Sequence, residues 1–385
     1  MKNRLWITAL TAAGSLGVYA QTADLPELQR QLNELTDKIA RLEKQSMATD
    51  AAELKKMIPS WVNNTSFKGD FRYRYENVEV ADSNTQDRQR VRLRVGMYGA
   101  VNDWVDYGIR VATGGASATS ANQTIDGATK KEVMLDQYYV DLHPESFRGA
   151  HLILGKMPQP WMNRTGLLWD GDLNPEGAVV KYDHKLESGL KLMANAGGFI
   201  LSDRKGDDLE LWAGQVGGQM KAGKASITAG FSDFYYQHAD RWGGAAGMVT
   251  NANTAGGKFH LLEGFAEVGV DVGIPLTFQG QYIVNVDAAR SNEDTAYLLG
   301  VSIGKASAKG SWEFGYNWRD TGADAVPDGF NDSDFANGVA DSHGHSFYAK
   351  YQIAKNLQAG ANYLMAKNGA GDEINTLQLD LNFKF

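Results

Sequence analysis

The last eleven residues, 375–385, limit the possible folds of this chain more than any other stretch. Apolar side chains occupy every second position and polar side chains fill the gaps; the apolar set is Leu377, Leu379, Leu381, Phe383 and Phe385. Because successive side chains of a β-strand point to opposite faces, a strand here has one apolar face and one polar face. A closed barrel with lipid outside and water inside satisfies both faces and leaves no free strand edge. The pattern therefore predicts an all-β transmembrane barrel.

The same alternation recurs from residue 66 onward, in about sixteen segments that we expect to form antiparallel strands. They centre on residues 66–76, 90–97, 105–111, 138–142, 150–154, 178–182, 190–196, 209–220, 225–231, 262–272, 276–286, 297–303, 312–319, 347–353, 357–365 and 375–385. Short turns alternate with longer connections, which are 77–87, 113–131, 156–176, 232–258 and 319–342. Short turns at one rim and long loops at the other are typical of outer-membrane barrels, whose two termini lie in the periplasm. All eight proline residues fall outside these segment interiors, as a continuous hydrogen-bonded ladder requires.

Composition agrees with a barrel and excludes other classes of protein. The mean hydropathy of −0.37 resembles that of a soluble protein, as expected when half of each spanning strand faces water. A soluble β-sandwich is the alternative fold, but it leaves the apolar face and the edge of the terminal strand in water, where strand edges promote aggregation. The absence of Cys excludes a disulfide framework and a cysteine zinc site, and the net charge of −8 argues against nucleic acid as a partner.

Residues 1–20 have the features of a cleavable signal peptide. Lys2 and Arg4 precede an apolar run at 5–18, and Val18 and Ala20 take the positions three and one before a cleavage site at Gln21. The run is too short for a membrane span, and no other run approaches the length that a spanning helix needs. We therefore expect an exported protein with no helical anchor.

Residues 21–58 follow a different period. Apolar residues recur there at spacings of three and four, which predicts a parallel coiled coil of about three heptads. The seam consists of Leu25, Leu28, Leu32, Leu35, Ile39 and Leu42. Because three heptads are short for independent stability, we expect this periplasmic segment to reinforce an oligomer that is also held together elsewhere. The alternative is a lone amphipathic helix that packs on its own protein.

The loop 156–176 is the most distinctive of the long connections. A sixteen-stranded barrel encloses a lumen wide enough for water, and a loop that folds inward narrows it. Gly155-Lys156, Pro160-Trp161 and the run 169–177 (Trp-Asp-Gly-Asp-Leu-Asn-Pro-Glu-Gly) resemble the signature of the bacterial outer-membrane family called putative porins, whose barrel is similar to that of phosphate-selective-type porins. The resemblance covers nearly the whole chain and implies a homotrimeric, water-filled diffusion channel for small hydrophilic solutes. The chain lacks an obvious Lys-rich loop cluster, so phosphate specificity does not follow.

Arginines mark the expected lining of the pore. Arg90, Arg92 and Arg94 alternate with apolar residues, and they must face the lumen because an arginine at lipid mid-depth costs about 2–4 kcal/mol. The predicted basic lining is Arg72, Arg74, Arg90, Arg92, Arg94 and Arg110. Asp170, Asp172 and Glu176 of the inward loop are expected to face it and to set up a transverse field. This arrangement predicts a weak preference for anions.

Other motifs point to no further chemistry. Residues 300–304 fit G-x-S-x-G, but that motif must link a strand to a helix, and here it lies inside an alternating strand. Residues 218–224 fit G-x-x-x-x-G-K, yet Ala225 replaces the hydroxyl residue that would hold magnesium. Three acids four residues apart along one strand are too far from each other for paired acid–base work, and we expect them to line the lumen: Glu263, Glu267 and Asp271. The acidic loop 320–334 is expected to be solvated.

We therefore expect residues 59–385 to form a porin of the bacterial outer membrane, surrounded by lipid and lipopolysaccharide, with 156–176 as its constriction. No catalytic, cofactor or metal site is expected. The resemblance also implies that the barrel assembly machinery reads the terminal aromatic residue, Phe385. Two other functions stay open: a structural tether or adhesin with a plugged barrel, and a barrel enzyme of lipase or protease type, for which no clustered Ser, His and acid set is found.

Overall fold

The computed structural model describes residues 25–57, 59–162, 165–241, 253 and 257–385. The predicted signal peptide, residues 1–20, lies outside the described residues. The chain divides into two units, Met1–Asn63 and Asn64–Phe385. The first is helical and the second is the barrel.

The helical unit contains α1 (Leu25–Met57) and the short α2 (Ser60–Asn63). α1 has 33 residues, which corresponds to a rod of about 50 Å. Four residues of the predicted seam are 50–65% exposed in the single chain: Leu32, Leu35, Ile39 and Leu42. The side chains of Leu25 and Leu28, also predicted for the seam, lie outside the described part. Among the described residues, no helix combines the length and apolar character needed to cross a membrane.

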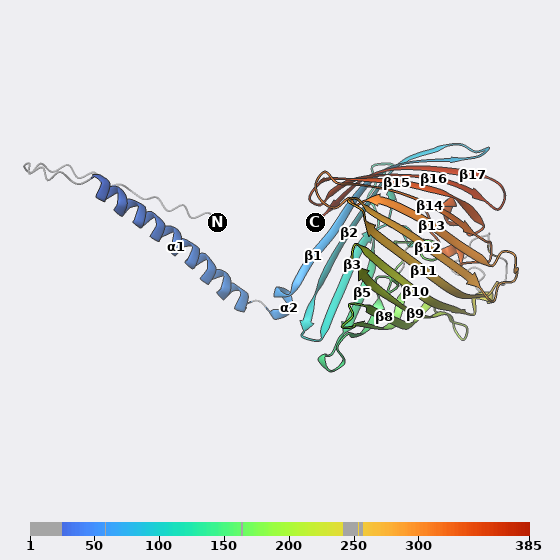
Figure 1. The fold of residues 1–385 in the computed structure, drawn as a ribbon, viewed down its shortest axis with the longest axis horizontal. Coiled ribbons are helices and arrows are strands. Elements are labelled where there is room, and N and C mark those ends of the chain that lie inside the picture. Colours follow the sequence, from blue (N-terminus) through green and yellow to red (C-terminus); the bar gives the residue numbers. More distant parts are fainter. Residues whose placement is uncertain (1–24, 58, 163–164, 242–252, 254–256) are drawn as a thin grey trace, which may run out of the picture. The chain divides into compact units, whose positions relative to one another are not determined.

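The barrel is one closed antiparallel sheet (Figure 1). Seventeen strands belong to it, but β4 (Gln123–Thr124) has two residues and pairs only with β2, so sixteen strands make the wall, as predicted. They are β1 (Thr65–Val80), β2 (Gln86–Asn102), β3 (Val105–Thr113), β5 (Val133–Leu142), β6 (Ala150–Lys156), β7 (Glu176–Lys185), β8 (Lys191–Ser202), β9 (Leu209–Ala222), β10 (Ala225–Gln237), β11 (Phe259–Asp271), β12 (Pro275–Asn285), β13 (Thr295–Gly304), β14 (Trp312–Thr321), β15 (Ser342–Ala354), β16 (Leu357–Asn368) and β17 (Glu373–Lys384). Pairing of β1 with β17 closes the sheet.

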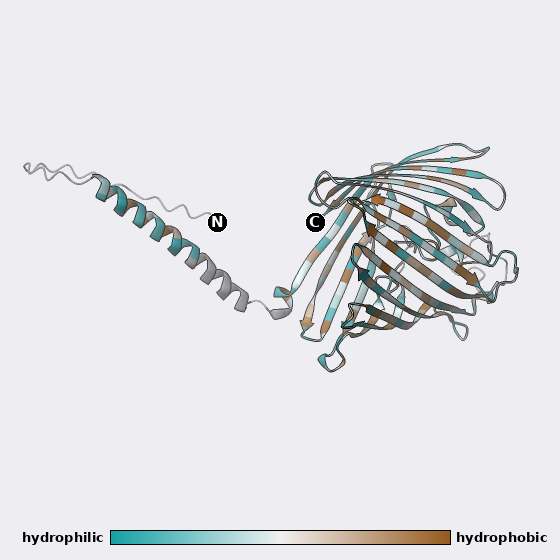
Figure 2. Ribbon diagram, in the orientation of Figure 1, coloured by the Kyte–Doolittle hydropathy of each residue, from teal (hydrophilic) through white to brown (hydrophobic). Residues whose placement is uncertain are grey.

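The outer surface of the wall is apolar, as the alternation predicts. On β17, Leu379 is 46% exposed whereas the neighbouring Gln378 is 1% exposed, because the leucine points outward and the glutamine inward. Figure 2 shows hydrophobic and hydrophilic residues alternating along the wall strands. Exposed aromatic residues gather near both rims, as in the aromatic girdles of membrane barrels: Trp104, Phe147, Trp312 and Phe385 by the short turns, and Trp212, Tyr235, Tyr282 and Tyr363 by the longer loops.

Two of the predicted long loops are shorter than expected. The connection placed at 77–87 is reduced to 81–85, because β1 continues to Val80 and β2 begins at Gln86. Asp87 accepts hydrogen bonds from Tyr75 and Asn77 across this hairpin, and these polar residues interrupt the apolar alternation without ending the strand. The connection placed at 232–258 likewise begins later, since β10 extends to Gln237.

An apolar core fills part of the lumen. The described residues of loop 157–175 fold inward and pack with loop 322–341 against the inner face of β8 to β13. Trp161 lies edge-on to Phe234, with ring centroids 5.0 Å apart, and Trp169 stacks on Phe330 at 5.4 Å. The core contains Met157, Leu167, Leu168, Leu173, Phe199, Leu211, Leu261, Ile283, Leu298 and Val326 as well. The inner face of this half of the wall is therefore apolar near the loops, and the acidic loop 320–334, expected to be solvated, belongs to the interior.

Candidate functional site

An arginine wall lines the lumen on β1, β2 and β3. It consists of the six predicted residues and Arg88, which the sequence analysis missed: Arg72, Arg74, Arg88, Arg90, Arg92, Arg94 and Arg110. In the β1–β2 ladder, Arg72 lies directly opposite Arg92. Arg74 is likewise opposite Arg90, so these side chains share one face of the sheet. Arg88 lies two residues before Arg90 on the same strand, and this spacing could have predicted that it also faces the lumen.

Carboxylates on the wall strands pair with these arginines. The pairs are Asp70 with Arg92 and Arg94, Glu76 with Arg88 and Arg90, Asp136 with Arg110, and Asp380 with Arg74 and, at 4.0 Å, with Arg72. The pair between Arg74 and Asp380 is bidentate, at 2.7 Å from Nε to Oδ1 and 2.9 Å from Nη2 to Oδ2. Since both side chains are nearly buried, this pair is stronger than a surface salt bridge. The arginine wall is thus a lattice of ion pairs rather than a row of free cations.

Two inward loops each bring a carboxylate to the arginine wall. Asp172 Oδ1 lies 3.3 Å from Arg92 Nη1 and 3.2 Å from Arg94 Nη1. Asp334, from loop 322–341, lies 2.8 Å from Arg74 Nη1. Of the three acids expected at the arginine wall, Asp172 contacts it, and Asp334 was not anticipated. Within the described part of the chain, seven guanidinium groups of the wall therefore meet six carboxylates.

Asp170, expected to face the arginines, lies instead at a junction of three loops. Its carboxylate accepts hydrogen bonds from the backbone N–H groups of Asp172 and Ser333, both at 2.8 Å. Ser333 Oγ lies 3.0 Å from Asp170 Oδ2 and 2.9 Å from the carbonyl oxygen of Thr119, so loop 114–132 joins the contact. Burial, with a further contribution from the nearby Asp332, raises the pKa of Asp170 to about 7. Asp170 thus connects loops and does not line the path.

Glu176 does not face the arginine wall. It is the first residue of β7 and lies opposite Lys156, in register with the outward-facing Val180. Its carboxylate accepts a hydrogen bond from Tyr138 and lies 3.9 Å from Lys156 Nζ. Because β7 begins at Glu176, this residue follows the alternation of the strand, and its side chain points to the outer face.

A polar belt on the far wall holds the inward loop. We use this name for five side chains on β8 to β12: Asn195, Gln215, Ser232, Glu263 and Gln281. Gln215 accepts from the backbone N–H of Met162 at 2.7 Å. Glu263, predicted as a lumen charge, is 2% exposed and accepts from Ser232 and, at 2.6 Å, from Gln281. It is a buried, hydrogen-bonded anchor rather than part of the path.

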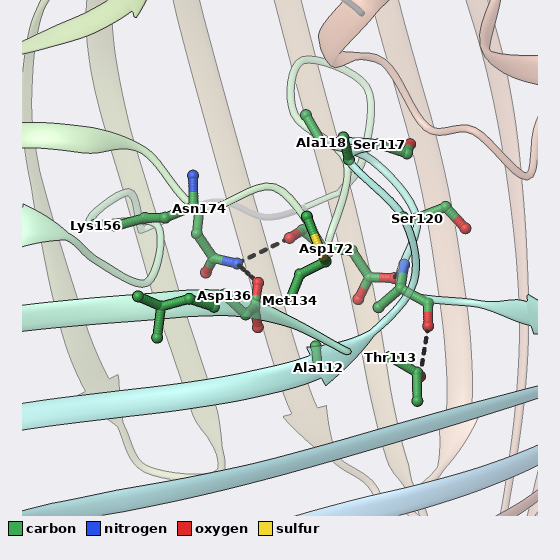
Figure 3. Close-up of a pocket in the computed structure, with 14 residues that line it drawn as sticks. Ala112, Thr113, Ser117, Ala118, Ser120, Met134, Asp136, Lys156, Asp172 and Asn174 are labelled. Atoms are coloured by element: carbon green, nitrogen blue, oxygen red, sulfur yellow. Dashed lines mark hydrogen bonds between the residues drawn. The ribbon is translucent and has the colours of Figure 1, made fainter. Parts of the chain in front are cut away.

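A cavity of about 290 Å³ lies beside the arginine wall, between loops 114–132 and 157–175 (Figure 3). Asn174 Nδ2 donates to Asp136 Oδ1 and to the carbonyl of Asp172, both at 2.9 Å, and so fixes one side of it. On the other side, Thr113 Oγ1 donates to the carbonyl of Ala121 at 2.9 Å. Small side chains of loop 114–132 leave the space open: Ala116, Ser117, Ala118 and Ser120. The cavity offers both hydrogen-bond donors and hydrogen-bond acceptors to a small polar solute.

Sequence comparison matches most of the chain to one family. The profile of the family described as "putative porin" matches residues 79–256 and 267–385. These two ranges include every wall strand in full except β1, of which they contain only the last two residues, and β11, of which they contain only the last five. A search of curated proteins finds no match.

Solved barrels share the fold at low sequence identity. The high-pH structure of Pseudomonas putida OprB is 12% identical, with a TM-score of 0.57 over 84% of this chain and 95% of that one. The Salmonella typhi OmpF complex with daunomycin is also 12% identical, with a TM-score of 0.53 over 84% of this chain and 98% of that one. At such identities the likeness concerns the architecture of the barrel.

Proposed function

The chain belongs to the putative porin family and is an outer-membrane diffusion channel, and we propose that it passes small hydrophilic solutes and ions with a weak preference for anions. The narrow part of the path lies where Asp172 and Asp334 reach the arginine wall. Solutes cross it passively, since a porin lumen is a water-filled conduit.

The charge imbalance at the arginine wall carries this proposal. Seven guanidinium groups against six carboxylates leave one net positive charge among the described residues of the wall and its contacts. One charge about 8 Å from a passing ion contributes about 0.5 kcal/mol at the dielectric constant of water, which enriches anions about twofold. Physiological salt screens the interaction over about 8 Å. The preference is therefore small and is greatest at low ionic strength.

Replacing three wall arginines tests the proposal. Arg90, Arg92 and Arg94 are changed to Gln together, and the zero-current potential is measured in a planar bilayer under a KCl gradient. We expect the potential to move toward cations, because the remaining carboxylates then outnumber the arginines. A control changes three exposed lysines in or next to the short turns to Gln: Lys221, Lys224 and Lys355. A potential that stays at its wild-type value in the arginine variant refutes the assignment.

The domain organisation and the surroundings form part of the same proposal. Residues 1–20 direct export, residues 21–58 form a periplasmic coiled coil, and residues 59–385 form the barrel, with 156–176 as the constriction. The apolar heptad seam on α1 supports a homotrimer, because such a seam gains stability against partner helices. The apolar wall contacts membrane lipid and lipopolysaccharide, and the barrel assembly machinery reads Phe385.

We also propose that the chain has no enzymatic activity. The G-x-S-x-G segment lies within β13 and leads into a turn, whereas a nucleophile of that kind needs a strand-to-helix elbow. Glu267 and Asp271 are four residues apart on one strand, a separation of about 13 Å, which is too long for a pair of catalytic carboxylates.

A further inference from the structure

A second cavity, of about 410 Å³, lies against the lumen face of β7 to β12 beneath the polar belt. Residues 160–162 of the inward loop form its roof. The arginine wall is nearly half-way round the barrel from it, because β2 and β10 are seven wall strands apart. The lining of this cavity is therefore separate from the arginine wall.

A free carboxylate marks one side of this cavity. Glu267, on β11, is exposed, and among the described residues no cation lies within ion-pair distance of it. Thr228 and Gln279 are its direct neighbours in the ladders on either side. The cavity also contains two lysines. Lys191 is paired with Asp183 at 3.1 Å and lies three strands from Glu267, about 14 Å along the wall, and Lys181, on β7, lies four strands away, about 19 Å. Glu267 is thus available to a charged solute.

An apolar strip adjoins the carboxylate. It consists of Met162, Met193 and Phe265, which all line the cavity. Two glycines make the strip possible: a Cβ atom at Gly217 would lie 2.7 Å from Met162 Cε, and one at Gly230 would lie 2.5 Å from the ring of Phe265. Because neither glycine has a side chain, the methionine and the phenylalanine lie directly on the backbone of β9 and β10.

We propose that this cavity is a subsite for a small organic cation with one ammonium group and an apolar body, such as a primary alkylammonium ion. Glu267 pairs with the ammonium group, Thr228 and Gln279 accept its remaining hydrogen bonds, and the apolar strip covers the hydrocarbon. The inference rests on the proposed function, since a solute reaches the cavity only through the lumen.

The two parts of the subsite have separable effects. The carboxylate attracts every monovalent cation, including Na⁺, whereas the apolar strip distinguishes an alkylammonium ion from Na⁺. Burying one methylene group strengthens association about fourfold. The permeability ratio of butylammonium to sodium therefore reports the strip, and the permeability of each ion alone reports the charge.

Bi-ionic potentials with butylammonium and sodium chloride test the inference on the full chain. We expect Met162→Gln to lower the permeability ratio of butylammonium to sodium about threefold, because it removes apolar contact with the butyl chain. Glu267→Gln should lower the permeability of both cations, and butylammonium should lose more. Glu187→Gln, which removes an exposed carboxylate in a turn outside the cavity, is the matched control and should change neither quantity.

The possible outcomes separate this inference from the proposed function. A wild-type protein that gives no channel refutes the proposed function. A normal channel whose ratio is unchanged in both Met162→Gln and Glu267→Gln refutes the subsite alone. A fall of the same size in Glu187→Gln also refutes the subsite, because it would assign the effect to the overall charge of the barrel.

Discussion

Replacing Asp172 by Asn removes the charge through which loop 157–175 touches the arginine wall. Its Oδ1 lies 3.2–3.3 Å from Arg92 and Arg94, and its Oδ2 accepts from the backbone N–H of Ala121 at 3.2 Å. Asn keeps the size of the side chain and one acceptor oxygen. The substitution therefore changes mainly the charge, and we expect it to increase the preference for anions.

The size of the effect follows from the distance to the path. One charge at about 8 Å contributes about 0.5 kcal/mol in water, so losing Asp172 should raise the chloride-to-potassium permeability ratio about twofold. Arg92→Gln removes a positive charge from the same place and should lower the ratio by a similar factor. The double variant should return to the wild-type value, since the two changes cancel in charge.

Zero-current potentials under a KCl gradient at low salt measure all three variants. Asp103→Asn, in the exposed turn between β2 and β3, is the control for a lost carboxylate outside the lumen. An Asp172→Asn channel whose anion preference stays equal or falls contradicts the reasoning. A double variant that remains far from wild type contradicts it too, because the two charges would then act on the path in different ways.

Three further predictions concern assembly and the loops. Phe385→Ala keeps both backbone hydrogen bonds to Gly69, so the folded barrel should lose little stability while its outer-membrane yield falls; an unchanged yield would remove the assembly role. Deleting residues 25–42 should leave conductance unaltered but lower the temperature at which trimers dissociate on a semi-native gel, and loss of conductance with intact barrels would contradict this. Because the pKa of Asp170 is raised from 3.8 to about 7, the folded state binds a proton that the unfolded chain releases, and the loop junction weakens as pH rises from about 4 to 7. Amide exchange at Ser333, corrected for its intrinsic rate, should be faster at pH 8 than at pH 5, and Asp170→Asn should abolish the difference; an equal difference in that variant would assign it to another group.

Local periodicity made the strands and the arginine face predictable. On β2, the arginines alternate with apolar residues, and this alternation alone predicts that the arginines face the lumen. The prediction of their orientation therefore needed no knowledge of other strands. Their partners could not be found in this way. Asp380 reaches Arg74 from 306 residues along the chain, and only the register of the closing strands brings the two together.

The loops show the same limit more sharply. Asp170 and Asp172 are two residues apart and of one chemical type, yet one is buried in a junction and the other touches arginines. Nothing in their sequence distinguishes them, since the packing of loop 322–341 decides which carboxylate is covered. Apart from Glu263, which was expected to line the lumen, the polar belt was missed for a related reason: its members are ordinary inward positions until neighbouring strands bring them together.

Because β1 pairs with β17, the barrel closes only when the chain includes its final strand. Until the last strand arrives, β1 keeps an open edge, and open edges recruit other chains. Arg74, almost fully buried in the finished protein, gains Asp380 through this pairing, and loop 322–341 adds Asp334. A chain that stopped short of β17 would carry an unsatisfied ladder, and Arg74 would lack its bidentate carboxylate partner. The strand pair that closes the sheet is therefore also the one that gives Arg74 its bidentate carboxylate.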